Sequence, residues 1–111
     1  MSTDSELTAM KQSLQQLVGE ADTMKRYAGF VEGVESDGAL DTKTTELMAL
    51  AIGAATPCDG CVQWHLDAAL EAGATREEII ETLEVATMMG GGPAMTSAIE
   101  AYQMLDDAGD D

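Results

Sequence analysis

The stretch Thr56-Pro57-Cys58-Asp59-Gly60-Cys61-Val62-Gln63-Trp64-His65 interrupts a helical pattern near the middle of this 111-residue chain. Pro57 ends the preceding helix, because the residue before a proline avoids the helical region. We expect a new helix to begin near Cys58, with both cysteines on its first turn. Cys61 and His65 are four residues apart and therefore share one face of that helix. The fold is expected to place a cysteine pair at a helix N-terminus.

This arrangement favours thiol chemistry. A helix N-terminus carries partial positive charge and free N–H groups, both of which stabilise a thiolate. His65, one turn along, can take up or return a proton, and a second thiol can resolve an oxidised first one. The helix start favours Cys58 as the attacking sulfur, whereas the position of His65 favours Cys61. The residues alone leave both assignments open.

Two other interpretations of the cysteine pair compete with redox chemistry. The cysteines could be small buried apolar residues in a helix. They could also bind zinc together with His65, with Glu46 as a fourth ligand. A structural zinc site usually has a second ligand pair at matched spacing, and the chain contains no other cysteine or histidine. We therefore favour redox chemistry and expect neither a metal nor an organic cofactor.

The remainder of the chain has apolar residues at helical spacing and no alternation typical of strands. Asp41 is a candidate N-cap, Thr75 and Glu78 form a capping-box pattern, and Gly90-Gly91-Gly92 is expected to break a helix before Pro93. These signals predict an all-α fold of about six helices in a single domain, residues 1–111. The core is expected over about residues 20–105, and residues 106–111 are expected to form a frayed acidic tail.

Charge limits the possible functions. The chain has 21 acidic and five basic residues, a formal charge of −16. Binding to nucleic acid through phosphates needs clustered Lys and Arg, so that class is excluded, and docking on anionic membranes is disfavoured. The acidic, lysine-poor composition resembles that of halophilic proteins. Residues 47–66 contain one acidic residue, Asp59, so the reactive stretch is nearly neutral within a negative chain.

Cellular location and assembly are also suggested by the sequence. Acidic residues stand where a secretory signal would be basic, and no apolar run is long enough to span a membrane, so we expect a cytoplasmic protein. Seven methionines besides Met1 fall mostly on apolar faces. Because a chain of this length has a thin core, this pattern indicates packing in the core or against other subunits.

The chain resembles the carboxymuconolactone decarboxylase superfamily, and within it the alkylhydroperoxidase D-like branch. The resemblance rests on Glu46, followed after eleven residues by Cys58-x-x-Cys61-x-x-x-His65. Residues 69–79 and 89–94 resemble two helix junctions of the family, and the likeness extends over roughly residues 20–105.

The resemblance implies a thiol-dependent peroxidase or disulfide reductase that assembles as a homo-oligomer, a trimer or hexamer. Cys61 would attack a hydroperoxide and Cys58 would resolve the sulfenic acid to a disulfide, which a dithiol or protein disulfide reductant would reopen. Glu46 and His65 match the proton-relay residues. Gly60 stands where alkylhydroperoxidase D has a second histidine, so the relay is shorter here.

Two other functions remain open at this point. One is a decarboxylase-like enzyme of the same fold that uses Glu46 and His65 without the thiols. The other is a non-enzymatic subunit that senses redox state or holds zinc.

Overall fold

The computed structural model describes residues 3–109, which fold into six α-helices joined by short turns, and no strand occurs within that range. The prediction of an all-α fold is therefore confirmed. The helices are α1 (Thr3–Glu20), α2 (Asp22–Glu35), α3 (Thr42–Ala55), α4 (Asp59–Glu71), α5 (Arg76–Gly90) and α6 (Gly92–Gly109).

Local capping chemistry determines where the middle helices begin. The Asp41 carboxylate accepts a hydrogen bond from the Thr44 N–H and caps α3, as the sequence predicted. Thr75 and Glu78 form the expected capping box at the start of α5. Cys58 is the N-cap of α4, so the cysteine pair does lie at a helix N-terminus.

Two helix ends differ in detail from the sequence expectation. Gly90 is still helical and Gly92 already begins α6, so the break at the three glycines is the single residue Gly91, whose φ of 70° suits glycine. Helix α6 continues through residues 106–109, so this part of the expected frayed tail is helical, and residues 110–111 lie outside the described range.

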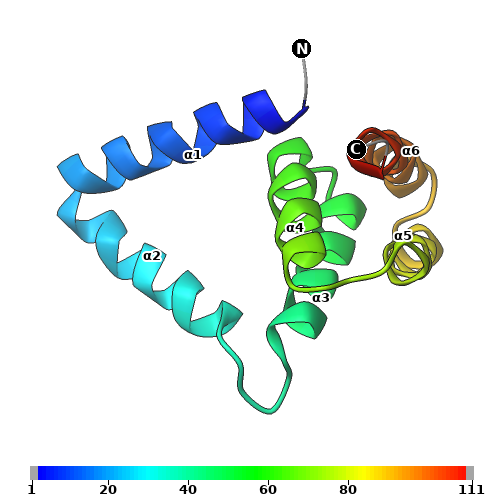
Figure 1. The fold of residues 1–111 in the computed structure, drawn as a ribbon, viewed down its shortest axis with the longest axis horizontal. Helices are drawn as coiled ribbons and strands as arrows, with labels where there is room; N and C mark the ends of the chain where they lie inside the picture. Colours follow the sequence, from blue (N-terminus) through cyan, green and yellow to red (C-terminus); the bar gives the residue numbers. More distant parts are fainter. Residues whose placement is uncertain (1–2, 110–111) are drawn as a thin grey trace.

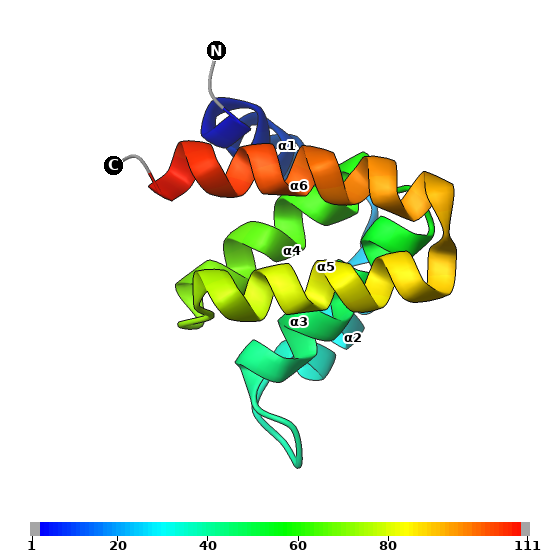
Figure 2. The ribbon, with the colours of Figure 1, turned by 90° about the vertical axis from the view of Figure 1, so that its right-hand side faces the viewer.

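Helix α3 lies at the centre of the molecule and packs against both α4 and α5, while α6 packs on α5 (Figures 1 and 2). The close contact between α3 and α4 depends on Gly53. A Cβ atom at this position would lie 3.0 Å from the Cβ of Cys61. The main core is apolar and combines small with branched side chains: Leu50, Ala54, Val62, Leu66, Ala69, Ala74, Ile79, Leu83, Ala86, Ala101 and Leu105.

Helices α1 and α2 form a V-shaped arm beside α3 and α4 (Figure 1). Lys11 of α1 ties the arm to α4, because its Nζ lies 3.3 Å from Asp67 and 5.4 Å from the centre of the Trp64 ring. Helix α2 buries none of its residues, and Tyr27 and Phe30 are about two-thirds exposed. The arm therefore presents a large uncovered apolar face in the single chain.

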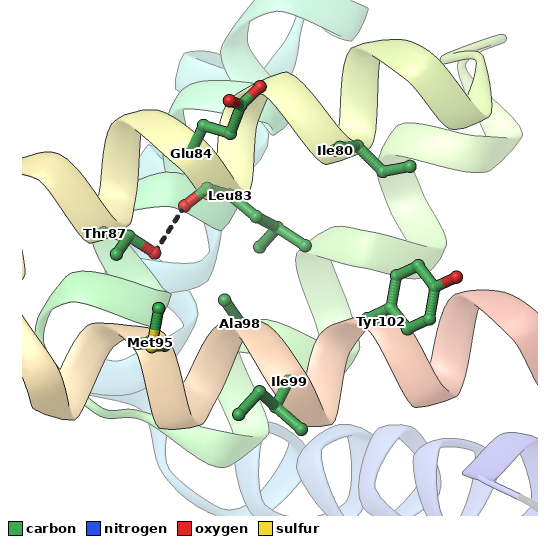
Figure 3. Close-up of a pocket in the computed structure, with 8 residues that line it drawn as sticks. All are labelled: Ile80, Leu83, Glu84, Thr87, Met95, Ala98, Ile99 and Tyr102. Atoms are coloured by element: carbon green, nitrogen blue, oxygen red, sulfur yellow. Dashed lines mark hydrogen bonds between the residues drawn. The ribbon is translucent and has the colours of Figure 1, made fainter.

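A second apolar surface runs along α5 and α6. It forms a groove of about 510 Å³ whose walls include Leu83, Ile99 and Tyr102 (Figure 3). Met88 and Met89, near the end of α5, are 73% and 76% exposed, so these methionines are not core residues of the single chain. Among the described residues, no helix has the length and apolarity needed to cross a membrane.

Candidate functional site

Cys58 and Cys61 are joined by a disulfide at the start of α4. Both residues are partly buried, and the backbone N–H of Cys61 donates to the Cys58 Sγ at 3.3 Å. The helix start thus acts directly on the sulfur of Cys58. Because both sulfurs are consumed in the disulfide, they cannot serve as thiolate ligands for zinc in this oxidised state.

His65 and Glu46 form the second half of the site. The His65 Nδ1 lies 2.6 Å from the Glu46 Oε1, and the Glu46 side chain is only 4% exposed. Helix α3 supplies the carboxylate and α4 supplies the ring, so the contact depends on the close packing of these two helices. Nδ1 is engaged with the carboxylate, which leaves Nε2 as the ring nitrogen for exchange with a sulfur or a substrate.

Glu35, which the sequence did not single out, lies beside this pair. Its Oε2 is 3.8 Å from the His65 Nδ1, and that oxygen is buried without a hydrogen-bond partner among the described residues. Burial raises the pKa of Glu35 and the neighbouring Glu46 carboxylate raises it further, whereas His65 lowers it. No sequence motif marks Glu35, which follows the apolar pattern of α2. Only the packing of α2 shows that this residue belongs to the site.

A pocket of about 370 Å³ opens over the disulfide. Its lining includes the disulfide, His65 from α4 and Glu35 from the end of α2. The rest of the lining is mainly apolar and comes from the arm and from α4: Met10, Leu14, Val31 and Trp64. The site therefore combines a disulfide with a mainly apolar pocket of the kind that binds organic molecules.

Comparison with known proteins shows the family of the chain. The model of the carboxymuconolactone decarboxylase family matches residues 21–104. The chain belongs to this family.

Two solved structures and one relative known from its sequence are similar to this chain. A carboxymuconolactone decarboxylase family protein from Legionella pneumophila superposes with a TM-score of 0.86 and 34% identity, over 95% of each chain. A Thermotoga maritima family protein with a suggested involvement in the antioxidative response gives a TM-score of 0.89 at 29% identity, over 95% of this chain and 91% of its own. An uncharacterized protein of the cox locus of Paracoccus denitrificans is 40% identical over 74 residues, 67% of each chain.

Glu35, Glu46 and His65 each place one potential ligand atom within 4.8 Å of the others. Two ligands at about 2.0 Å from a tetrahedral ion would be about 3.3 Å apart. The 2.6 Å contact between His65 and Glu46 is shorter and has the length of a charge-assisted hydrogen bond. Glu46 and His65 are therefore hydrogen-bonded to each other in this structure, and Glu35 lies beside them.

Proposed function

We propose that the protein is a thiol-dependent peroxidase or disulfide reductase. The observation that carries the proposal is the Cys58–Cys61 disulfide that lines a mainly apolar pocket together with His65, whose ring is hydrogen-bonded to Glu46. The family to which the chain belongs, and the suggested antioxidative role of the Thermotoga relative, support this proposal.

The proposed oxidative half of the cycle begins with the reduced cysteines. The Cys61 thiol gives its proton to His65, and the thiolate attacks the terminal oxygen of a hydroperoxide. The S–O bond forms, the O–O bond breaks, and His65 returns the proton to the departing alkoxide, which leaves as an alcohol. The Cys58 thiol then displaces the hydroxyl group of the sulfenic acid as water, which closes the disulfide.

The reductive half restores the thiols. A dithiol or protein disulfide reductant transfers two electrons and two protons to the disulfide and is itself oxidised to a disulfide. The cycle needs no metal or organic cofactor. Donors of this kind are kept reduced in the cytoplasm, where we propose that the protein works.

The assignment of roles to the two sulfurs is the finer part of the proposal. The N–H of Cys61 stabilises negative charge on Cys58, which suits a sulfur that leaves as a thiolate when the disulfide is reduced. Cys61 shares a helix face with His65, and the family resemblance gives it the attacking role.

Single-cysteine variants test these roles. With an organic hydroperoxide, Cys58→Ser should accumulate one sulfenic acid, trapped by dimedone at Cys61. Cys61→Ser should trap little and should not consume peroxide in the presence of a dithiol. Sulfenic acid forming at Cys58 in Cys61→Ser at the wild-type rate would reverse the assignment.

A decarboxylase-like activity is the second candidate, because the His65–Glu46 pair is hydrogen-bonded without any contribution from the thiols. The double variant Cys58→Ser/Cys61→Ser separates the two functions. A decarboxylase would keep its turnover of a γ-carboxylactone in this variant, whereas a thiol peroxidase would lose peroxide turnover.

A further inference from the structure

Glu35 occupies an unfavourable place for an ionised carboxylate. It is the last residue of α2, where the helix dipole presents negative charge, and the last turn of α2 has no basic residue. The Thr42 hydroxyl donates to the Glu35 carbonyl at 2.9 Å and fixes this helix end against the start of α3. The fold therefore holds the carboxyl group close to Glu46 and His65.

The surroundings of its side chain point to a bound proton. The buried Oε2 receives no hydrogen bond, and its acidic neighbour Glu46, when ionised, has no hydrogen to offer. A protonated Glu35 removes this deficit, because its O–H can donate to the Glu46 carboxylate. The charged and titratable groups around Glu35 are Glu32 on its own helix, Glu46 on α3, His65 and Cys61 on α4, and Cys58 at the N-cap of α4.

We propose that Glu35 is a positioning residue of the redox site, which holds a proton against Glu46 and keeps the carboxylate pair beside His65 at one negative charge. The inference rests on the proposed function. In the cycle His65 must accept the Cys61 proton and then release it to the alkoxide. The Glu35 proton is not consumed. When Glu35 loses it, a second negative charge beside His65 stabilises the imidazolium and hinders that release.

The sign of the pH dependence follows from this role. A raised pKa means that the folded protein favours the protonated form of Glu35. Glu35 therefore adds to the free energy of unfolding at low pH, and this contribution is lost as the pH rises through the raised pKa of the folded protein. Glu35→Gln is permanently neutral. Its melting temperature should match that of the wild type at low pH and exceed it increasingly as pH rises.

The same substitution should change the pH profile of peroxide reduction. We expect the rate of Glu35→Gln divided by the rate of the wild type to be close to one at low pH. Above the midpoint of the Glu35 titration this ratio should rise to about tenfold, because one neighbouring charge shifts a proton equilibrium by about that factor. Glu81→Gln is the matched control, because it removes the same charge from an exposed position on α5, away from the groups that surround Glu35. Its rate ratio should stay flat across this pH range.

Carbon NMR of protein labelled at the glutamate carboxyl carbon, in the disulfide form, tests the proton directly. The Glu35 signal, identified by its loss in Glu35→Gln, should titrate above the Glu32 signal and share its midpoint with the rate ratio and with the melting-temperature difference. Titration together with Glu32, or a Glu35→Gln rate reduced by the same factor at every pH, would overturn the proposal.

The two proposals fail in different ways. If no form of the protein consumes peroxide, the proposed function falls, and the part assigned to Glu35 in the relay falls with it. The carbon titration still decides whether Glu35 holds the proton, because that measurement requires no turnover.

Discussion

Glu46 is an acidic residue whose side chain is buried in the site. Its side chain is almost fully enclosed and is hydrogen-bonded to His65. Glu46→Gln keeps the shape and an acceptor oxygen but removes the charge that supports a protonated ring. We expect peroxide-driven thiol oxidation to slow about 10²-fold, within the range for general acid–base catalysis.

Stopped-flow measurement of thiol loss would check this prediction. Glu81→Gln, at an exposed position on α5, removes the same charge away from the site and should react at the wild-type rate. Equal rates for Glu46→Gln and the wild type would remove Glu46 from the relay.

The sequence could predict the site residues that lie at a fixed spacing within one segment. Cys58, Cys61 and His65 lie within two helical turns, so helix periodicity alone brings them to one region. The relay role of Glu46 required the family resemblance, because its contact with His65 crosses between helices. Glu35 was missed, since its role depends on how α2 packs over a helix that begins more than twenty residues later.

At the scale of helices, the α3–α4 contact positions the site, and Gly53 makes this contact close. Gly53→Ala places a methyl group 3.0 Å from the Cβ of Cys61. We expect a loss of about 1–3 kcal/mol in the free energy of unfolding, typical of overpacking, and slower closure of the disulfide. Chemical denaturation and timed thiol trapping measure the two effects.

Gly33→Ala provides the matched control on α2. A Cβ there meets nothing within 4 Å, and helical Gly→Ala changes usually stabilise by about 0.5–1 kcal/mol. If both alanine variants were stabilised alike, the close approach of α3 to Cys61 would not constrain the site.

Helix starts were predictable because capping is local. Asp41, Cys58 and Thr75 each satisfy N–H groups only three residues ahead. Helix ends were harder to predict from the sequence, because they depend on small differences between competing backbone hydrogen bonds. The extent of α6 beyond residue 105 and the single-residue break at Gly91 are the two examples.

At the scale of the whole molecule, the exposed apolar face of the α1–α2 arm supports the proposed homo-oligomer, a trimer or hexamer. Tyr27, Phe30 and Val34 are all more than half exposed in the single chain. Phe30→Asp should lower the mass measured by light scattering toward that of the 11.6 kDa monomer. An unchanged assembly would exclude this face as the interface.

The net charge of −16 predicts a salt effect on the reaction. The negative field disfavours a thiolate, against the helix start and His65, and salt screens this field over a Debye length of about 10 Å at 0.1 M and less at higher concentration. We expect peroxide consumption to accelerate as potassium chloride is raised toward molar levels. A rate that falls steadily, with fold and oligomer intact, would contradict both this electrostatic account and the halophilic interpretation.

The central claim is that Cys58 and Cys61 pass between dithiol and disulfide when the protein meets a hydroperoxide. Intact-mass and free-thiol analysis of the reduced protein, before and after one equivalent of hydroperoxide, tests it most directly. The account predicts a mass lower by two hydrogens with both thiols consumed. Unchanged mass with both thiols still free would contradict it.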